Sequence, residues 1–253
     1  MVGGWAANAL AQADDTFTGF VAAGIANVPQ YEGSDDYEIK PLVAAQLDYR
    51  GYSLEILGTD LRAEVSPWEW VEFGPSLSFR GGREDDVDNE AVRRLREIDD
   101  AFEAGVFVRF PFHAVLSLRD RLSLRAEALF DLSDTYDGYV LSFAASYDYQ
   151  VNDVLTLGVS LQTTYASEDY QQTYFGIDAD NAVRSGLAPY EADAGFKDVG
   201  IRFSAKYMFT QEWGVIGLLG YQKVLGDAAD SPIVEQEGDA NQWLGGIGVV
   251  YEF

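Results

Sequence analysis

The last stretch of the chain, residues 243–253, constrains its fold more than any other segment. Its apolar side chains recur with period two and share one face of an extended strand, with Gly245 as the single gap: Trp243, Ile247, Val249, Tyr251 and Phe253. The other face carries mainly Gln242, Gly246, Gly248 and Glu252. An apolar face with aromatic rings at both ends suits a strand that crosses a bilayer, because such rings occupy the two membrane–water boundaries.

This closing strand, which ends on Phe253, resembles the C-terminal signal of bacterial outer-membrane β-barrels. The resemblance implies that the protein resides in the bacterial outer membrane. Composition agrees, because no window reaches the roughly 18 consecutive apolar residues of a transmembrane helix. A slightly negative mean hydropathy is also expected of a barrel, in which lipid-facing and lumen-facing residues alternate. The absence of Cys excludes disulfide and thiol chemistry.

The first 13 residues have the character of the tail of a secretory signal peptide. Ala11-Gln12-Ala13 is a small-residue cleavage site, and acidic Asp14 follows it. The basic region of a complete signal is missing, so we expect the true start upstream. An ordinary N-terminal extension is the alternative. Residues 14–253 are then expected to form a single barrel domain.

Alternation with period two recurs along almost the whole chain and predicts an all-β, antiparallel, up-and-down transmembrane barrel. We expect strands near residues 16–28, 39–49, 52–57, 60–66, 69–80, 100–112, 115–132, 139–150, 154–166, 198–209, 214–225 and 241–253. The apolar phase slips at Gly58-Thr59-Asp60, which indicates a turn between two strands. This gives about 12 strands, an even number as bacterial single-chain barrels prefer. A bulged single strand would give eleven, and a further error in pairing would give ten.

The connections alternate in length, as expected of short periplasmic turns and long extracellular loops. The short set is 49–51, 66–68, 112–114, 150–153 and 210–213, and the long set is 29–38, 81–99, 133–138, 167–197 and 226–240. The brief Gly58-Thr59 turn is the exception among the outer connections. The long loops contain 24 acidic and 6 basic residues, which is −18 of the chain's net charge of −25.

This charge excludes a nucleic-acid partner, since the protein would repel phosphate. The acidic loops face anionic lipopolysaccharide, so one hypothesis is that they bind Ca²⁺ or Mg²⁺ loosely through hard oxygen ligands, with Asp35 and Asp36 as candidates. The alternative is a merely solvated loop surface. No firm metal site and no cofactor are predicted.

Strand phase directs most of the basic residues into the lumen, among them Lys40, Arg80 and Lys223, together with acidic partners such as Glu55, Glu72, Glu103 and Glu252. The lumen or pore candidates are Arg62, Glu64, Arg109, Arg121, Arg125, Glu127, Arg202 and Lys206. Mixed charges in a narrow lumen are expected to pair, because an unpaired charge away from water is unfavourable. They serve either as ion pairs that hold the barrel wall together or as a polar permeation path or solute site.

The sequence lacks the residues that most enzymes require. His113, the only histidine, lies in a predicted periplasmic turn, away from the outer rim where a membrane-embedded hydrolase would use it. There is no metalloprotease motif, no phosphate-binding loop and no dinucleotide fingerprint. We therefore expect no catalytic residues, and an enzyme is the weakest of three functional hypotheses.

Several ordered segments are similar to the MipA/OmpV family, the MltA-interacting and OmpV-like outer-membrane proteins. They are residues 28–37 with Pro41-Leu42, 173–177 with 185–190 and 194–195, 225–234, and the end at 251–253. The loop at 81–99 fits the family's spacing but is more charged than expected. The resemblance covers most of residues 16–253.

The resemblance implies an outer-membrane barrel without catalytic residues. It implies a structural or scaffolding role at the cell envelope, linking a murein-degrading lytic transglycosylase to a penicillin-binding synthase. A scaffold would present its partner surface on the periplasmic turns, where we expect Trp68, Trp70, Trp213 and His113 to cluster, although an aromatic belt explains the tryptophans as well. The alternative function is a narrow channel or uptake protein for small solutes. A monomer or weak oligomer, in contact with lipid and lipopolysaccharide, is expected in either case.

Overall fold

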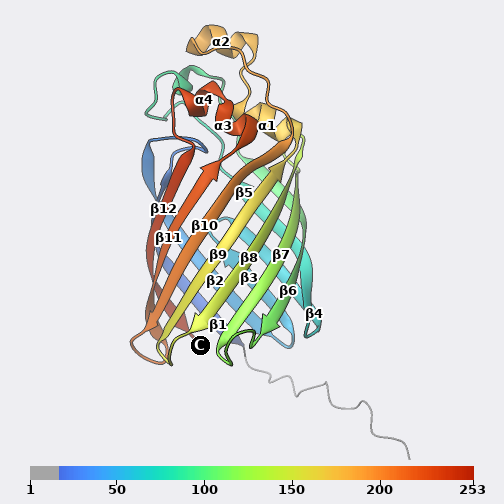
Figure 1. Cartoon of the computed structure of the whole chain (residues 1–253), viewed down its shortest axis with the longest axis vertical. Coiled ribbons are helices and arrows are strands. Elements are labelled where there is room, and N and C mark those ends of the chain that lie inside the picture. Colours follow the sequence, from blue (N-terminus) through green and yellow to red (C-terminus); the bar gives the residue numbers. More distant parts are fainter. Residues whose placement is uncertain (1–16) are drawn as a thin grey trace, which may run out of the picture.

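The computed structural model describes residues 17–253 and shows twelve antiparallel strands closed into one barrel (Figure 1). Neighbouring strands are consecutive in the sequence, and the barrel closes where β1 pairs with β12. The strands are β1 (Thr18–Pro29), β2 (Tyr37–Tyr49), β3 (Tyr52–Leu57), β4 (Asp60–Trp68), β5 (Val71–Arg80), β6 (Ala101–His113), β7 (Asp120–Asp131), β8 (Tyr139–Gln150), β9 (Leu155–Ala166), β10 (Gly195–Met208), β11 (Trp213–Val224) and β12 (Asn241–Glu252). The prediction of twelve strands is confirmed. The interpreted signal peptide at 1–13 lies outside the described residues.

The predicted outward face of the last strand is the lipid-facing surface. Trp243 and Ile247 are 53% and 62% exposed, whereas Val250 on the opposite face is 1% exposed. The same alternation holds around the barrel, because each register aligns outward residues with outward residues. No helix among residues 17–253 is long and apolar enough to cross a membrane.

Residues 52–66, for which the sequence allows either two strands or one bulged strand, form two strands. β3 pairs with β4 in register from Tyr52 opposite Val65 to Leu57 opposite Asp60, and only Gly58 and Thr59 connect them. Gly58 has a φ of 60°, a conformation that glycine adopts at little cost in a tight hairpin turn. The single bulged strand is therefore wrong.

Two short turns differ from the prediction. β4 continues to Trp68, so the turn to β5 lies at residues 69–70 rather than at 66–68. β7 begins at Asp120 rather than at 115. The physical reason for the second difference is that the Asp120 carboxylate accepts hydrogen bonds from the backbone N–H groups of Val115, Leu116 and Ser117, at 2.7, 2.9 and 2.7 Å. These three groups are thereby withdrawn from a strand ladder and form a turn instead.

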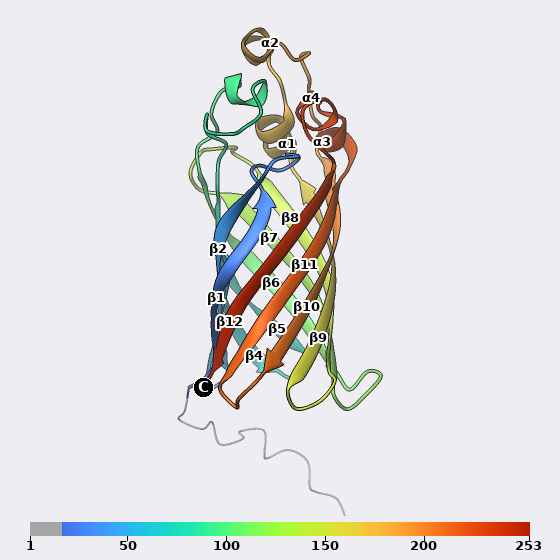
Figure 2. The same cartoon turned by 90° about the vertical axis from the view of Figure 1, so that its left-hand side faces the viewer.

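All long connections face one end of the barrel, as does the brief turn at 58–59, and the other short turns and the C-terminus lie at the opposite end (Figures 1 and 2). The long connections contain short helices that alternation does not predict: η1 (Val92–Arg94), α1 (Glu168–Phe175), α2 (Ala179–Ser185), α3 (Gly226–Asp230) and α4 (Pro232–Glu235). Ser167 caps α1 by accepting from the N–H of Tyr170, and Asp178 caps α2 by accepting from the N–H of Asn181. Helices of at most 8 residues are too short to show a helical period.

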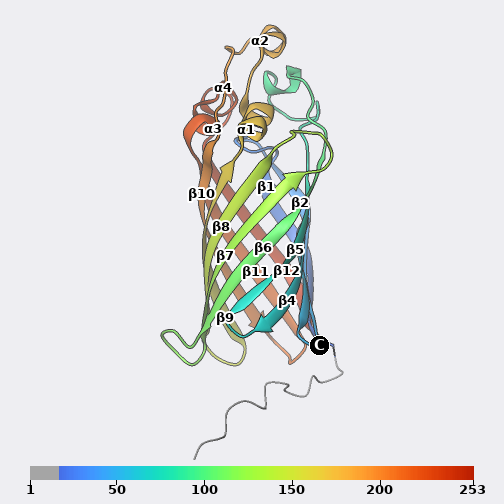
Figure 3. The ribbon, with the colours of Figure 1, turned by 90° about the vertical axis from the view of Figure 1, so that its right-hand side faces the viewer.

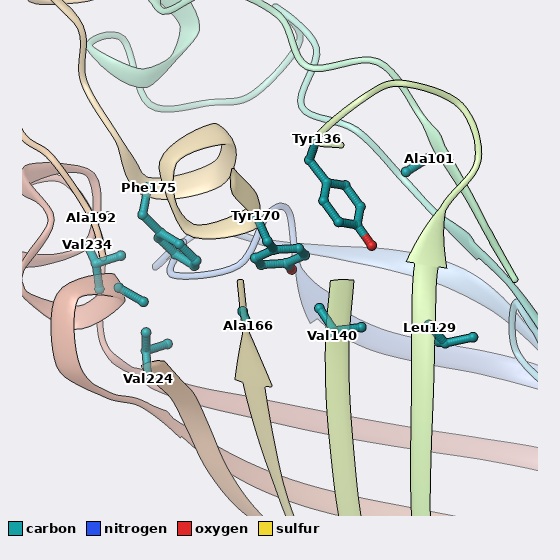
Figure 4. Packing of buried hydrophobic residues seen from close by; sticks show 11 residues of the cluster. Ala101, Leu129, Tyr136, Val140, Ala166, Tyr170, Phe175, Ala192, Val224 and Val234 are labelled. Carbon is teal, nitrogen blue, oxygen red and sulfur yellow. The ribbon is translucent and has the colours of Figure 1, made fainter. Parts of the chain in front are cut away.

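The largest hydrophobic core lies at the extracellular end, not inside the membrane. Tyr170 and Phe175 of α1 point down over the ends of β8 and β9, beside Val140 and Ala166 (Figure 4). Val234 of α4 belongs to the same cluster. Tyr170 is 1% exposed and Phe175 is fully buried. The loops therefore fold into a packed cap on the barrel instead of standing free in water.

Candidate functional site

The register of the strands shows which charged residues face the lumen. Directly paired residues point to the same side of a sheet, so the chain of partners Glu55–Arg62–Ser76–Gly105 marks an inward row. All eight lumen candidates fall on inward rows of this kind. Lys223 does not: it pairs with outward Val199, and its predicted lumenal position is wrong.

Arg62 is the most buried basic group of this lumenal wall, with a side chain only 3% exposed. It donates from Nε and Nη2 to the two carboxylate oxygens of Glu127, at 2.8 and 2.9 Å. It also contacts Glu55 and Asp60, each at 3.1 Å. This bidentate arrangement gives a charge-assisted pair its best geometry, which a buried charge requires.

Arg109 is the second centre of the network. It donates to Glu55 at 2.6 Å and contacts Glu64 and Glu72, each at 3.2 Å. Arg121 pairs with the same Glu72 at 2.7 Å. Strands β3 to β7 are thus joined by carboxylates that two or more guanidinium groups share. The role of Glu55 and Glu72 as shared partners was not apparent from the sequence, in which alternation indicates only their inward phase.

Two of the predicted lumen residues lie apart from this network, and a third lies at its edge. Lys206 pairs with Glu252 near the periplasmic end. Arg202, on β10, has no ion pair or hydrogen bond from its side chain to any part of the chain that the structure describes. Arg125 joins the network through a 4.0 Å contact with Glu55 and through the charge of Glu127. The structure therefore places six of the eight candidates together on β4, β6 and β7, and leaves Arg202 and Lys206 on β10.

The lumen has three unlike walls. The wall of β3 to β7 carries the charged network, and the wall of β8 and β9 carries small or polar inward residues such as Ala144, Ser146 and Ser160. Around the middle of β11, β12, β1 and β2 the inward residues are apolar or glycine: Ile216, Leu218, Gly220, Leu244, Gly246, Gly248, Val250, Ala22, Gly24, Ala26, Leu42 and Ala44. Bulky charged groups on one wall and small groups on the others leave space between them.

Two cavities occupy this space. One of about 360 Å³ is lined by four arginines, including Arg121 and Arg125, and reaches Asp148 near the periplasmic end of β8. Another of about 240 Å³ lies above it and reaches Glu32 in the first extracellular loop. Arg202 and Gln162 line both cavities and therefore stand between them.

The cap closes the extracellular end over these cavities. The hydroxyl of Tyr170 donates to Glu32 at 3.1 Å, and Lys197 bonds to both Glu32 and Asp198. The guanidinium of Arg80 lies 5.1 Å from the centre of the Tyr170 ring. Burial acts to raise the pKa of Glu32, but the charge and hydrogen bond of Lys197, the charge of Arg80 and the hydrogen bond of Tyr170 together outweigh it and hold this pKa below its ordinary value of 4.5. Glu32 is therefore an ionised anchor for α1.

A bulge in β10 makes this closure possible. The pairing of β10 with β9 shifts register between Phe196 and Asp198, so the extra residue, Lys197, breaks the alternation. As a result Lys197 and Asp198 are both buried, at 5% and 2% exposed. The sequence prediction ended the loop at residue 197 and missed this arrangement, since period two assigns adjacent residues to opposite faces.

The expected tryptophan cluster is wrong. Trp68 stacks on Trp70 with ring centres 5.7 Å apart, but Trp213 packs on Tyr251 at 4.8 Å. β4 and β11 are five strands apart in the barrel order, so the two groups lie on different sides. The solvent-exposed His113 is the last residue of β6, opposite Arg121. These aromatic pairs fit two parts of a membrane-boundary belt better than one docking surface.

The proposed weak cation loop also has a defined geometry. Asp36 lies within reach of the charges of Asp35 and of Asp88 in the second long extracellular loop, and desolvation followed by these two charges raises the pKa of Asp36. Residues 17–253 contain no group of three or more His, Cys, Asp or Glu side chains placed to hold a metal ion. Loose binding of Ca²⁺ or Mg²⁺ stays a prediction, which calorimetric titration with Ca²⁺ would check.

Comparison with known proteins gives a consistent result. A family model described as MltA-interacting protein MipA matches residues 21–253. The MltA-interacting protein of Escherichia coli (strain K12) is 30% identical over 132 residues, or 51% of this chain and 50% of that protein, so the chain is aligned with about half of that relative's length. "Putative outer membrane protein YiaT" of Escherichia coli O157:H7 is 26% identical over 220 residues, covering 85% and 84% of the two chains. Among solved structures, outer-membrane expressed OmpT of Vibrio cholerae covers 96% of this chain and 100% of its own, with a TM-score of 0.44 and 9% identity.

Proposed function

This chain belongs to the MltA-interacting protein MipA family, and on that basis we propose that it anchors peptidoglycan-remodelling enzymes at the outer membrane. The partner would be a periplasmic lytic transglycosylase, with a penicillin-binding protein as a second partner. The apolar strand faces would contact lipid, and the acidic loops would face lipopolysaccharide. A scaffold of this kind needs exposed side chains at its periplasmic end that do not pack against the barrel and are free to contact a partner.

The β6–β7 turn, residues 114–119, is the observation that carries the proposal. Leu116 and Leu118 are 82% and 94% exposed, and no other large apolar side chain that the structure describes at the periplasmic end is as exposed. Figure 3 shows the green β6–β7 turn projecting outward from the lower rim of the barrel. Asp120 fixes the turn by three backbone hydrogen bonds, and its carboxylate also accepts from the Tyr147 hydroxyl at 2.9 Å. An apolar tip on a rigid turn can bind a partner without a large loss of entropy.

The test is direct binding in a lipid nanodisc. The protein would be immobilised and exposed to purified lytic transglycosylases and penicillin-binding proteins from the same bacterial envelope. We expect the double variant Leu116→Glu, Leu118→Glu to weaken binding by about tenfold or more, since buried apolar anchors dominate such interfaces. Val151→Glu, Val154→Glu is the matched control, because it places the same charges in the neighbouring β8–β9 turn.

Two results would count against the proposal. Absence of binding between the natural protein and any of these enzymes would reject the scaffold. Equal binding by the natural protein and the Leu116→Glu, Leu118→Glu variant would reject the assigned surface and leave the scaffold to be located elsewhere. Unchanged circular dichroism of both variants is required, so that a loss of binding is not a loss of the barrel.

The second candidate function is a narrow channel for small solutes, which the two lumenal cavities favour. The cap fills the extracellular end, so a scaffold predicts a silent barrel in a planar bilayer, while a channel predicts steady discrete currents. A channel also predicts that Arg121→Ala or Arg202→Ala changes the conductance, because both side chains line the larger cavity. Currents that are present but unaffected by either substitution would place the ion path outside this cavity.

A further inference from the structure

Two of the four arginines that line the larger lumenal cavity lack a close ion pair with a carboxylate of residues 17–253. Of its four arginines, Arg109 and Arg121 make close ion pairs with the network, at 2.6 and 2.7 Å. Arg125 makes no ion pair closer than the 4.0 Å contact with Glu55, and Arg202 makes no ion pair with a carboxylate of residues 17–253. Glu55 is already bound by Arg62 and Arg109, so Arg125 competes for an oxygen that is in use.

The carboxylates around these two arginines make no close ion pair with them. The charge of Asp60 reaches Arg202, but Asp60 accepts hydrogen bonds from Arg62 and Ser78. The charge of Glu127 reaches Arg125, but both oxygens of Glu127 accept from Arg62. Asp148, which also lines the cavity, lies opposite Arg121 in register and makes no close ion pair with Arg125 or Arg202. Two guanidinium groups in the cavity wall therefore lack the close ion pair that such groups normally have.

The wall between the two arginines leaves room for a ligand and offers it donors. One inward row runs from Arg125 through Ala144 and Gln162, and the next ends on Arg202 after Ser146 and Ser160. Only two strands separate β7 from β10, so side chains of the length of arginine can approach one group from both sides. The amide of Gln162 adds donors, and a volume of about 360 Å³ is in the range of small-molecule sites.

Part of the cavity lining is apolar. Ile216 and Leu218 of β11 and Leu57 of β3 supply this part. A bare inorganic ion would leave these groups in contact with water only. A ligand that carries one anionic group and one apolar group would satisfy both the arginines and this surface.

We propose that the lumen of this barrel is a binding chamber for a small organic anion with an apolar part, held by Arg125 and Arg202. This goes beyond the anchoring function and does not depend on any protein partner. The anion enters from the periplasm, because the cavity reaches Arg121 and Asp148 close to the periplasmic strand ends, whereas α1 and its tyrosines close the opposite end. A carboxylate or a phosphate would serve as the charged group, since guanidinium groups bind both.

Calorimetric titration of the full chain in lipid nanodiscs tests this with three probes of one size. Benzoate supplies the anion, benzyl alcohol removes the charge, and benzylamine reverses it. We expect heat of binding from benzoate only. Arg202→Gln and Arg125→Gln should each weaken the binding of benzoate by about tenfold or more, as the loss of a charge-assisted hydrogen bond implies.

Lys206→Gln is the matched control, because it removes a lumenal cation that Glu252 already neutralises. We expect this variant to bind benzoate like the natural protein, and Arg202→Lys to retain part of the affinity. Equal heats from benzoate and benzyl alcohol, no binding of benzoate, or equal losses in Lys206→Gln and Arg202→Gln would each overturn the proposal. Unchanged barrel circular dichroism in the glutamine variants separates lost binding from lost folding.

Discussion

Arg62 of β4 and Glu127 of β7 form a bidentate ion pair inside the barrel, although 65 residues separate them in the sequence. Their side chains are only 3% and 4% exposed. β5 and β6 stand between their strands in the wall, so the pair joins positions that backbone hydrogen bonds do not connect directly. Part of the lumen is therefore filled by buried, paired charged side chains.

Breaking this pair on one side is expected to destabilise the barrel strongly. Arg62→Gln leaves Glu127 buried without its main partner, which corresponds to about 3–5 kcal/mol for a buried pair. Urea unfolding of the refolded protein in lipid vesicles would measure the change. Arg94→Gln is the control, because Arg94 and Glu90 are 59% and 74% exposed and their pair should contribute about 1 kcal/mol or less.

The double variant Arg62→Leu, Glu127→Leu should recover most of the stability that Arg62→Gln loses. Removing both charges leaves no unpaired buried ion at this position, and such replacements are often neutral. The same unfolding experiment applies. A double variant as unstable as the single one would mean that the other contacts of Arg62, with Glu55 and Asp60, carry the stability.

Acidification is expected to loosen the cap. The pKa of Glu32 is lower in the folded protein than its ordinary value of 4.5, so its ionised form stabilises the fold above that value. This stabilisation is lost as the pH falls from 4.5 through the folded-state pKa, when the carboxylate is protonated and its bond to Lys197 weakens.

The chain has no Cys, so a single spin label at Glu168→Cys on α1 can report this change. Its mobility should rise as the pH falls below 4.5. Glu32→Gln should show higher mobility at neutral pH and a smaller rise on acidification. An identical pH profile in both proteins would mean that Glu32 does not cause the transition.

Removal of α1 is expected to open the barrel. A short Gly-Ser linker in place of residues 168–192 would delete Tyr170 and Phe175, which fill the extracellular end. We expect steady currents from this variant in a planar bilayer and none from the natural protein. Tyr170→Phe serves as the control: it keeps the ring over Val140 and loses only the hydrogen bond to Glu32, so it should stay closed.

Asp120→Asn should loosen the β6–β7 turn while the barrel stays folded. Val115 donates to one oxygen of Asp120, and Leu116 and Ser117 donate to the other. Asparagine replaces one of these oxygens by a donating NH2 group and removes the charge from the other, so the turn should open more often. Hydrogen exchange at these three amides should quicken. Unaltered exchange there, with a normal spectrum, would mean that the turn is fixed by its backbone alone.

Much of the fold could be predicted from the sequence because a barrel strand repeats a two-residue pattern that needs no knowledge of distant contacts. Alternation located β8, β9 and β12 almost to the residue. It failed where a single side chain changes the local geometry, as Asp120 does in the β6–β7 turn and Lys197 does at the bulge of β10. It also missed α1, whose 8 residues depend on packing against strand ends far away in the sequence.

The candidate site, like the fold, could be predicted from the sequence only in part. Inward phase alone assigns Arg62, Arg109 and Glu127 to the lumen, because alternation gives each residue of a strand a face. Which acid each arginine contacts depends on how twelve strands are staggered around a closed wall, and no local pattern encodes that stagger. A membrane barrel with a charged interior and acidic loops therefore follows from the order of the residues. The packing of those loops into a cap, and the lack of an ion-pair partner for Arg202 among residues 17–253, follow only from the folded protein, because both depend on residues that closure of the barrel brings together.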